Sequence, residues 1–181
     1  MRHPASYTRT AIGLHWLVAI AIVTTFSVGL YMSDLPLSPD KLKIYSWHKW
    51  AGVTIFLLVA FRLMWRLTHL PPALPVGMPA WQHTAAEAAH WLLYALMIAV
   101  PLSGWLMSSA KGFQTVYFGV LPLPDLLAKN KELGKTLETV HQALNFTMAG
   151  LVLAHAGAAL KHHFIDRDAV LARMLPFLKK A

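Results

Sequence analysis

The stretch from residue 136 to residue 163 reads TLETVHQALNFTMAGLVLAHAGAALKHH, and it is long and apolar enough to cross a bilayer as one helix. Within it, His141 and His155 stand 14 positions apart. At about 100° per residue this is close to four whole turns, so both imidazoles leave one face of the helix, about 21 Å apart along its axis. An ionisable side chain inside a membrane span is costly and marks a functional candidate. This helix is therefore expected to serve two sites at two depths.

Three further apolar stretches precede this one, at about residues 9–32, 44–67 and 87–109. The second is the least obvious, because Lys49 and Arg62 must snorkel toward opposite interfaces for it to cross. Hydrophobic residues make up 56% of the 181-residue chain and charged residues 13%, a balance that fits a membrane solvent. We therefore expect an all-α fold, a four-helix transmembrane bundle in which residues 1–181 form a single domain.

Prolines punctuate the connections between the expected spans. The first apolar segment is too long for a cleavable signal peptide, so it is expected to remain as a helix. After the first span the chain is broken by Pro36 and Pro39. After the second span it is broken by Pro71, Pro72, Pro75 and Pro79, and after the third by Pro122 and Pro124.

The composition also excludes several functions. The net charge of +8 could suggest nucleic acid, but the basic residues stand at helix ends and show no interleaved aromatic pattern for base stacking, so no nucleic-acid partner is expected. The chain has no cysteine, which excludes disulfides, iron–sulfur clusters and a thiolate haem ligand. It has ten histidines. A redox role must therefore rest on histidine or methionine ligation.

The distribution of basic residues predicts the orientation. The side that holds both termini carries nine: Arg2, Arg9, Arg62, Arg66, Lys161, Arg167, Arg173, Lys179 and Lys180. The opposite side carries seven: Lys41, Lys43, Lys49, Lys111, Lys129, Lys131 and Lys135. The positive-inside rule therefore favours cytoplasmic termini for a multi-pass protein of a bacterial inner membrane.

Four histidines form pairs by depth. His15 and His155 each lie about six residues, or about 9 Å, in from the expected cytoplasmic side. His48 and His141 open the second and fourth spans, near the periplasmic side. A haem needs two axial ligands on opposite faces, and facing helices of a bundle can provide them as neutral imidazoles. The pairs predict two b haems stacked across the membrane, with the iron bound by His15 and His155 and by His48 and His141.

Other readings of the histidines stay open. A membrane histidine can be a packing residue or an interfacial anchor, and imidazole also suits zinc or nickel in a haem-free metal transporter, although the spans lack the carboxylates that such a pathway shares. His90 rivals His15 as partner to His155 by depth, and we interpret it as a neighbour of the haem site. His162 and His163 can simply anchor the helix end. The remaining histidines, expected to be solvated, are His3, His69 and His83.

The residues also resemble a known family, the bacterial cytochrome b-561 family, whose better-known members are superoxide oxidases. The likeness covers nearly the whole chain and depends on the order and spacing of several short motifs. These are Tyr7-Thr8-Arg9 leading to Leu14-His15-Trp16-Leu17, His48-Lys49-Trp50-Ala51-Gly52, Arg62-Leu63-Met64-Trp65-Arg66, His90-Trp91-Leu92-Leu93-Tyr94, Pro101-Leu102-Ser103-Gly104-Trp105, and the run from His141 through His155 to His162-His163.

The resemblance implies the same haem ligands, His15 and His155 on the inner haem and His48 and His141 on the outer one. It further implies that superoxide is oxidised to oxygen at the periplasmic face and that ubiquinone accepts the electron near the inner haem. Two bis-histidine haems leave no open coordination position, so such a site permits outer-sphere transfer.

Charged residues acquire expected roles from this scheme. Lys49, with Lys41 and Lys43, would attract the superoxide anion. A role as ordinary lysines at the membrane interface explains these residues equally well. Arg62 and Arg66, four apart on one helical face, suit haem propionates or positive-inside anchoring.

For quinone, the residue carried over from the family is His162. The family's loop lysine after the second helix is missing here, where residues 75–78 read Pro-Val-Gly-Met.

The main alternative function is a cytochrome b membrane subunit that links quinone to a periplasmic hydrogenase or dehydrogenase. Its ligand arrangement would be similar, and the sequence reveals no protein-partner surface. The haem-free transporter is the alternative of another class.

Overall fold

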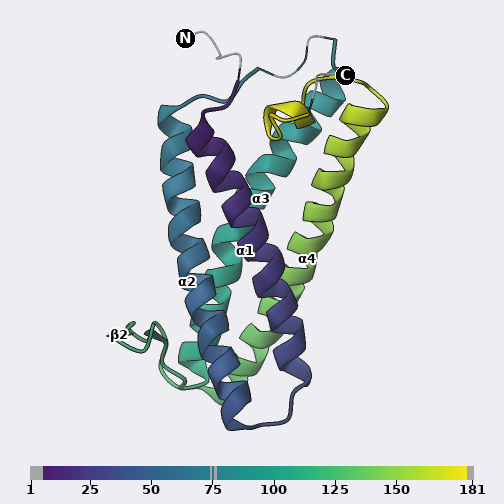
Figure 1. The fold of residues 1–181 in the computed structure, drawn as a ribbon. Helices are drawn as coiled ribbons and strands as arrows, with labels where there is room; N and C mark the ends of the chain where they lie inside the picture. Colours follow the sequence, from purple (N-terminus) through teal and green to yellow (C-terminus); the bar gives the residue numbers. More distant parts are fainter. Residues whose placement is uncertain (1–5, 74, 76, 179–181) are drawn as a thin grey trace.

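The computed structural model describes residues 6–73, 75 and 77–178. Four long antiparallel helices, α1 (Arg9–Asp34), α2 (Pro39–Thr68), α3 (Ala80–Ala110) and α4 (Lys131–Phe164), form the bundle. The start of α1 and the end of α4 lie at one end of it, as Figure 1 shows. We call this the termini end, and the opposite end the loop end. The short strands β1 (Val116–Tyr117) and β2 (Leu121–Pro122) join α3 to α4, and a 3-10 turn, η1 (Leu171–Arg173), follows α4.

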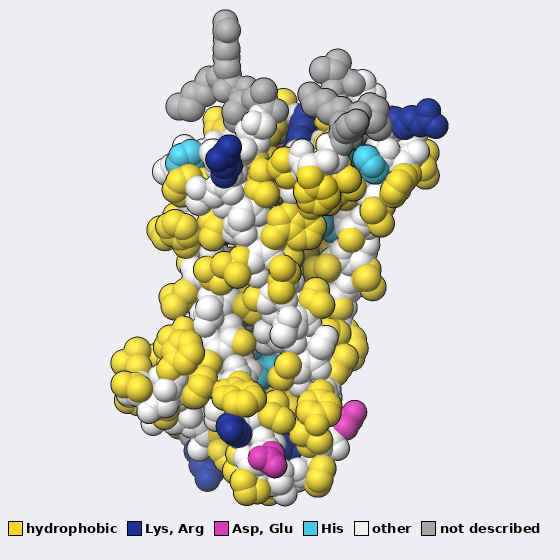
Figure 2. All heavy atoms as spheres, viewed as in Figure 1, with side chains coloured by type: hydrophobic (Ala, Val, Ile, Leu, Met, Phe, Trp, Pro, Cys, Tyr) yellow, Lys and Arg dark blue, Asp and Glu magenta, His cyan; other side chains and the backbone are white. Residues whose placement is uncertain are grey.

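All four helices are long and apolar enough to cross a membrane. In Figure 2, hydrophobic side chains cover the middle of the bundle, whereas Lys and Arg side chains lie toward its two ends. Large apolar side chains such as Ile20 and Leu153 are exposed on the outer faces of α1 and α4. Such exposure is unfavourable in water and favourable in lipid. The chain is therefore a multi-pass membrane protein, and the expected four-helix fold is confirmed.

Three helices extend beyond or begin at the expected positions with polar residues capping them outside the apolar stretches. Thr8, Ser38 and Asn130 each accept a hydrogen bond from a backbone N–H of the first turn that follows. With these caps α2 begins five residues before the predicted position 44 and α4 five before 136. The third helix, α3, begins seven residues before 87, directly after Pro79 and without a side-chain cap. Pro39, expected to break the chain, instead begins α2, where its missing N–H costs nothing.

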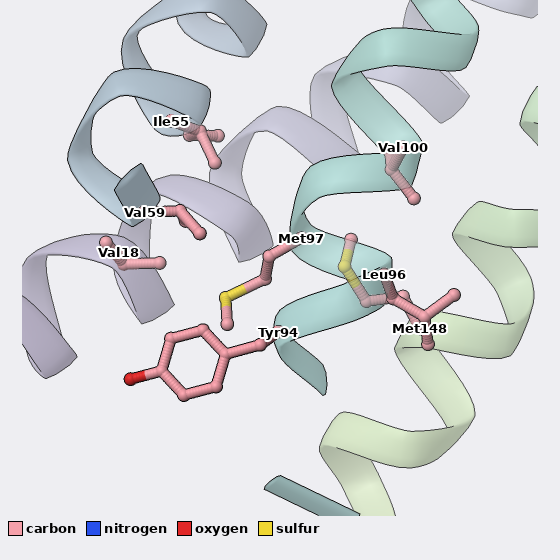
Figure 3. Close-up of a cluster of buried hydrophobic side chains, with 8 residues drawn as sticks. All are labelled: Val18, Ile55, Val59, Tyr94, Leu96, Met97, Val100 and Met148. Atoms are coloured by element: carbon pink, nitrogen blue, oxygen red, sulfur yellow. The ribbon is translucent and has the colours of Figure 1, made fainter. Parts of the chain in front are cut away.

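A cluster of buried side chains from all four helices holds the bundle together at mid-height. Figure 3 shows its eight members: Val18, Ile55, Val59, Tyr94, Leu96, Met97, Val100 and Met148. Within the bundle α1 packs on α2, α2 on α3 and α3 on α4, whereas the backbones of α1 and α4 stay apart. The ring of helices is therefore tight on three sides and looser on the fourth.

The hairpin at the loop end was not predicted from the sequence. Strands β1 and β2 pair antiparallel, and Phe118 (φ 51°) and Gly119 (φ 72°) turn the chain between them. The hairpin is tied to α2, because Trp50 donates its indole N–H to the Val116 carbonyl at 2.6 Å and Thr54 shares a 2.9 Å hydrogen bond with the Tyr117 hydroxyl. Each strand has only two residues, too few for sequence periodicity to reveal.

Candidate functional site

The four paired histidines meet inside the bundle at two levels. We call the His15–His155 pair the inner site and the His48–His141 pair the outer site. The ring centroids are 6.3 Å apart in the inner site and 6.4 Å apart in the outer site. Two imidazoles bound to one metal ion from opposite sides, with metal–nitrogen bonds of about 2 Å, place their ring centres about 6 Å apart. Both pairs therefore have the separation that one iron between them requires.

Hydrogen bonds on α3 fix the tautomer of His141. Its Nδ1 lies 3.1 Å from the Val100 carbonyl, which can only accept, so Nδ1 carries the proton. The same N–H also reaches the Ser103 hydroxyl oxygen at 2.9 Å, and that hydroxyl donates in turn to Val100. With the proton on Nδ1, Nε2 keeps its lone pair. His141 is thus held in the form that binds a metal through Nε2.

Two glycines allow the outer imidazoles to lie against the helix backbones. A Cβ on Gly104 of α3 would lie 3.1 Å from Cε1 of His141, and a Cβ on Gly29 of α1 would lie 3.1 Å from Cε1 of His48. Such distances are too short for an ordinary side-chain contact, so alanine at either position would push the ring away. The sequence analysis predicted no role for either glycine, although Gly104 belongs to one of the motifs quoted above.

The outer site has the features of a cofactor site. Nδ1 of His48 is buried and, among the described residues, forms no hydrogen bond within the usual limits, although the Thr25 backbone lies beside it. The two imidazoles line one mostly apolar cavity. Its other lining residues are Ile22, Thr25, Phe26, Gly52, Ile55, Met97, Val100, Pro101, Asn145 and Met148. An apolar space with an imidazole on either side fits a flat, largely apolar macrocycle with two axial nitrogen ligands.

His90 lies closer to His155 than His15 does. Its ring centroid is 5.4 Å from that of His155, with the rings nearly perpendicular. This separation is about 1 Å shorter than two opposed iron ligands require. The contact suits an edge-to-face neighbour of the proposed ligand pair, and this role of His90 stays a prediction.

An arginine forms a hydrogen bond to one ring nitrogen of His15. Nη2 of Arg62 donates to Nδ1 of His15 at 3.0 Å, because a guanidinium cannot accept. In this arrangement the His15 proton is on Nε2. Iron binding through Nε2 requires that proton to move to Nδ1, so Arg62 must then release His15 and find another acceptor. The inner site therefore fits a haem only together with an acceptor for this arginine.

The inner site is rich in cations that lack acidic partners. Arg62 stacks over Tyr94, and Arg66 over Trp91 and Tyr94, at 5.5–5.8 Å. Neither arginine forms an ion pair with a carboxylate within the described part of the chain. Two unpaired guanidinium groups beside a histidine pair form a favourable place for carboxylate groups.

Tyr7 precedes α1 at the same end and was quoted only as a motif residue. Burial raises the pKa of its hydroxyl, and the nearby cations Arg66, Arg173 and Arg62 lower it in part. The Tyr7 hydroxyl therefore stays a neutral hydrogen-bonding group above the inner site.

His162 does not stand alone at the end of α4. Its Nδ1 lies 2.7 Å from Oδ2 of Asp168 and 3.1 Å from Oδ2 of Asp166. The neighbouring His163 has a buried Nδ1 without a hydrogen-bond partner among the described residues, and its ring packs on Phe164. The two adjacent histidines thus have different surroundings, which the sequence did not reveal because the carboxylates lie beyond the helix end.

The lysines at the loop end are engaged with backbone carbonyls or aromatic rings. Lys49 donates to the Phe113 carbonyl at 2.8 Å, and Lys41 donates to the carbonyls of Ser33 and Leu35. Lys43 lies over the Trp47 ring at 5.1 Å. These contacts leave the positive charge of each lysine in place. Lys49 therefore combines a charge near the outer site with a contact to the segment that leads into the hairpin.

Comparison with known proteins identifies the family of the chain. Residues 6–177 match the model of a family described as prokaryotic cytochrome b561. The chain is 34% identical to cytochrome b561 homolog 2 of Escherichia coli K12, over 95% of this chain and 92% of that protein. It is 31% identical to cytochrome b561 homolog 1 of the same organism, over 94% and 97%. It is 30% identical to the probable superoxide oxidase CybB of Yersinia pestis, over 94% and 96%.

The family model matches almost the whole chain, and the relatives align with nearly all of it. Haem b binding and a role in electron transfer follow from the family. The chain belongs to the prokaryotic cytochrome b561 family.

Proposed function

We propose that this membrane cytochrome oxidises superoxide to oxygen at the loop end and passes the electrons to ubiquinone at the termini end. The observation that carries the proposal is the ring-centroid separation within two histidine pairs, 6.3 Å in the inner site and 6.4 Å in the outer site, one toward either end of the bundle. The name of the Yersinia pestis relative, a probable superoxide oxidase, supports the substrate.

Two haem b groups would be held by residues of all the helices except α3. His48 and His141 would hold the outer group, and His15 and His155 the inner one. When bound, such haems supply reversible one-electron transfer without an open coordination position. The chain's own contribution is orientation, because Val100 and Ser103 fix the His141 tautomer and Gly29 and Gly104 make room for the rings.

Positively charged side chains would bind the haem propionates and attract superoxide. Arg62 and Arg66 have no carboxylate partners among the described residues and suit the propionates of the inner haem. Lys49 keeps its charge near the outer site and would attract superoxide.

Quinone binding is assigned to the termini end, where His162 lies seven positions beyond His155. This offset is about two turns, so His162 lies about 10 Å from the inner ligand on nearly the same face. Its imidazole can donate to a quinone carbonyl, and Asp168 holds the ring in place.

By sequence, nine basic residues fall on the expected side of both termini and seven on the opposite side, which supports cytoplasmic termini in a bacterial inner membrane. In this orientation superoxide is consumed on the periplasmic side. Reaction of the superoxide anion with whole cells and with inverted membrane vesicles tests the orientation, because only the former expose the loop end.

A metal transporter is disfavoured by the positions of the metal-binding groups. Among the described residues, three such groups come together only at His162, Asp166 and Asp168, beside the end of α4. Nothing comparable continues through the bundle in the part of the chain that the structure describes. A partner-dependent membrane subunit would bind haem in the same way, and it differs in needing a partner enzyme for its reduction.

The decisive experiment uses the purified protein alone. Stopped-flow mixing with superoxide should reduce the haems, and a short-chain ubiquinone should then reoxidise them. A protein that binds haem yet is not reduced by superoxide would overturn the superoxide proposal and favour the partner-dependent subunit.

A further inference from the structure

The chain that follows α4 folds back and is held in place at several points. The N–H of Asp168 bonds to the His162 carbonyl at 3.0 Å, and further on the Met174 carbonyl accepts the Trp16 indole N–H of α1 at 2.8 Å. Arg173 donates to the Ala73 carbonyl in the α2–α3 connection at 2.6 Å. This C-terminal segment, residues 165–178, therefore has a defined position over the end of the bundle, as Figure 1 shows.

The segment determines which nitrogen of His162 is available. Both carboxylates reach Nδ1, Asp168 at 2.7 Å and Asp166 at 3.1 Å. Ionised carboxylates only accept, so Nδ1 carries the proton and Nε2 is the nitrogen that can exchange one. The His162 side chain is 15% exposed and that of Asp168 20%, so the pair is shielded from bulk water although not sealed from it.

The two carboxylates are not equivalent. Lys161 donates to both oxygens of Asp166, at 2.8 and 2.6 Å, and neutralises that carboxylate. Asp168 lacks a cationic partner other than His162 among the described residues; its Oδ1 accepts only the Val170 N–H at 2.9 Å. The Lys161 contact also argues against a metal ion in this cluster, because it occupies the third ligand. The arrangement is therefore a histidine–carboxylate pair.

We propose that Asp168 is a positioning residue that holds His162 for proton delivery to the quinone, an inference that rests on the proposed function. Reduction of a quinone to a quinol takes two electrons and two protons. The electrons come from superoxide, which is oxidised to oxygen. Two superoxide ions each give one electron. The first proton passes from Nε2 of the His162 imidazolium to a quinone oxygen: the Nε2–H bond breaks, an O–H bond forms, and the Nδ1–H of the now neutral His162 stays hydrogen-bonded to Asp168. Water on the cytoplasmic side restores the Nε2 proton, and the second proton reaches the other quinone oxygen by the same route.

In many hydrolases an aspartate likewise accepts the Nδ1–H of a catalytic histidine and so orients its ring. The carboxylate stabilises the imidazolium and excludes the wrong tautomer. Within the described part of the chain, the charged groups that face His162 are Asp168 and Asp166 from the C-terminal segment and Lys161 from α4. The pH profile of the quinone step should therefore differ between the parent protein and a variant that lacks the Asp168 carboxylate.

The test compares Asp168→Asn with Asp166→Asn in the haem-loaded protein. The asparagine at 168 keeps an oxygen for the Val170 N–H, but its amide donates to Nδ1 of His162 and reverses the tautomer. Reoxidation of the reduced haems by a short-chain ubiquinone should slow at least about tenfold, given the usual contribution of general acid–base catalysis. Reoxidation by ferricyanide needs no proton and should be unchanged. Asp168→Glu should restore the quinone rate, and Asp166→Asn should stay near the parent rate.

The outcomes separate the two proposals. If His162→Ala reoxidises with quinone at the parent rate, the assignment of His162 to the quinone site fails, and the role of Asp168 fails with it. If His162→Ala is slow while Asp168→Asn matches the parent in rate and pH profile, the role of Asp168 alone is overturned. Equal slowing of the quinone and ferricyanide reactions, or equal slowing in Asp166→Asn, would mean that the carboxylates only maintain the fold.

Discussion

Gly104 lies against the ring of His141, so that a Cβ at this glycine would come within 3.1 Å of Cε1. The contact couples the packing of α3 and α4 to the placement of a proposed haem ligand. Gly104→Ala should displace the ring and lower the occupancy of the outer haem, while the inner haem remains. Haem-to-protein ratio and low-temperature electron paramagnetic resonance measure this change.

Gly150 of α4 provides the matched control, because a Cβ there would meet nothing within 4 Å. Gly150→Ala should keep both haems. Equal haem loss in the two variants would mean that alanine disturbs the helices in general and would remove the special role of Gly104.

The second prediction concerns the ligands themselves. The parent protein should bind about two low-spin haems per chain, because each histidine pair fills both axial positions. His155→Ala should lose the inner haem and His141→Ala the outer haem, each reducing the haem content by about half. His90→Ala should keep both haems, since its ring is only 5.4 Å from that of His155. Loss of a haem in His90→Ala, together with retention of both in His15→Ala, would show that the inner pair is wrongly assigned.

The third prediction concerns Arg62, which donates to His15 at 3.0 Å. A nearby positive charge favours the reduced haem, because reduction adds a negative charge. Arg62→Gln should therefore lower the midpoint potential of the inner haem by something on the order of tens of millivolts. Spectroelectrochemical titration measures the shift. An unchanged potential would place the guanidinium away from the haem and leave membrane anchoring as its role.

The fourth prediction concerns Lys49. Reduction of the haems by superoxide should slow as ionic strength rises, because exposed charges are screened over about 10 Å at 0.1 M salt. Lys49→Gln should slow it as well. Lys111→Gln is the control, because Lys111 is already paired with Glu138 at 2.9 Å. A rate that responds neither to salt nor to Lys49→Gln would show that superoxide is not attracted by this charge. It would not affect the assignment of the haem ligands.

The fifth prediction separates the adjacent histidines at the end of α4. His162→Ala should keep both haems and slow reoxidation by quinone about tenfold or more, because the proton donor is lost. His163→Ala should reoxidise at the parent rate, since its ring packs on Phe164 and its Nδ1 has no described partner. Stopped-flow spectroscopy of both variants decides the matter, and equal impairment would withdraw the assignment of His162.

The spans and the paired histidines could be predicted from the sequence because apolar length and helical period are local properties. The 14 positions between His141 and His155 place both rings on one face whatever surrounds them. The four-helix fold is confirmed, while the ligand roles stay predictions. Helix ends were less predictable, because capping residues such as Ser38 lie outside the apolar stretches.

Contacts between distant segments were beyond the reach of the sequence. The tautomer of His141 depends on Val100 and Ser103, which reach it only after α3 packs on α4. Likewise, Asp168 approaches His162 because the chain reverses after α4. Such contacts require the tertiary structure, since neither residue type is unusual at its position.

The separation of α1 and α4 also bears on how the protein is made. Along the chain α1 precedes α4, and α4 carries one histidine of each pair. Neither pair can exist in a nascent chain that ends before α4. Haem held by these pairs would therefore be bound only after α4 has been made. Because few backbone contacts join α1 to α4, their apposition depends on side-chain contacts such as that between Phe26 and Phe146. A chain that stops before α4 would lack one proposed ligand of each haem.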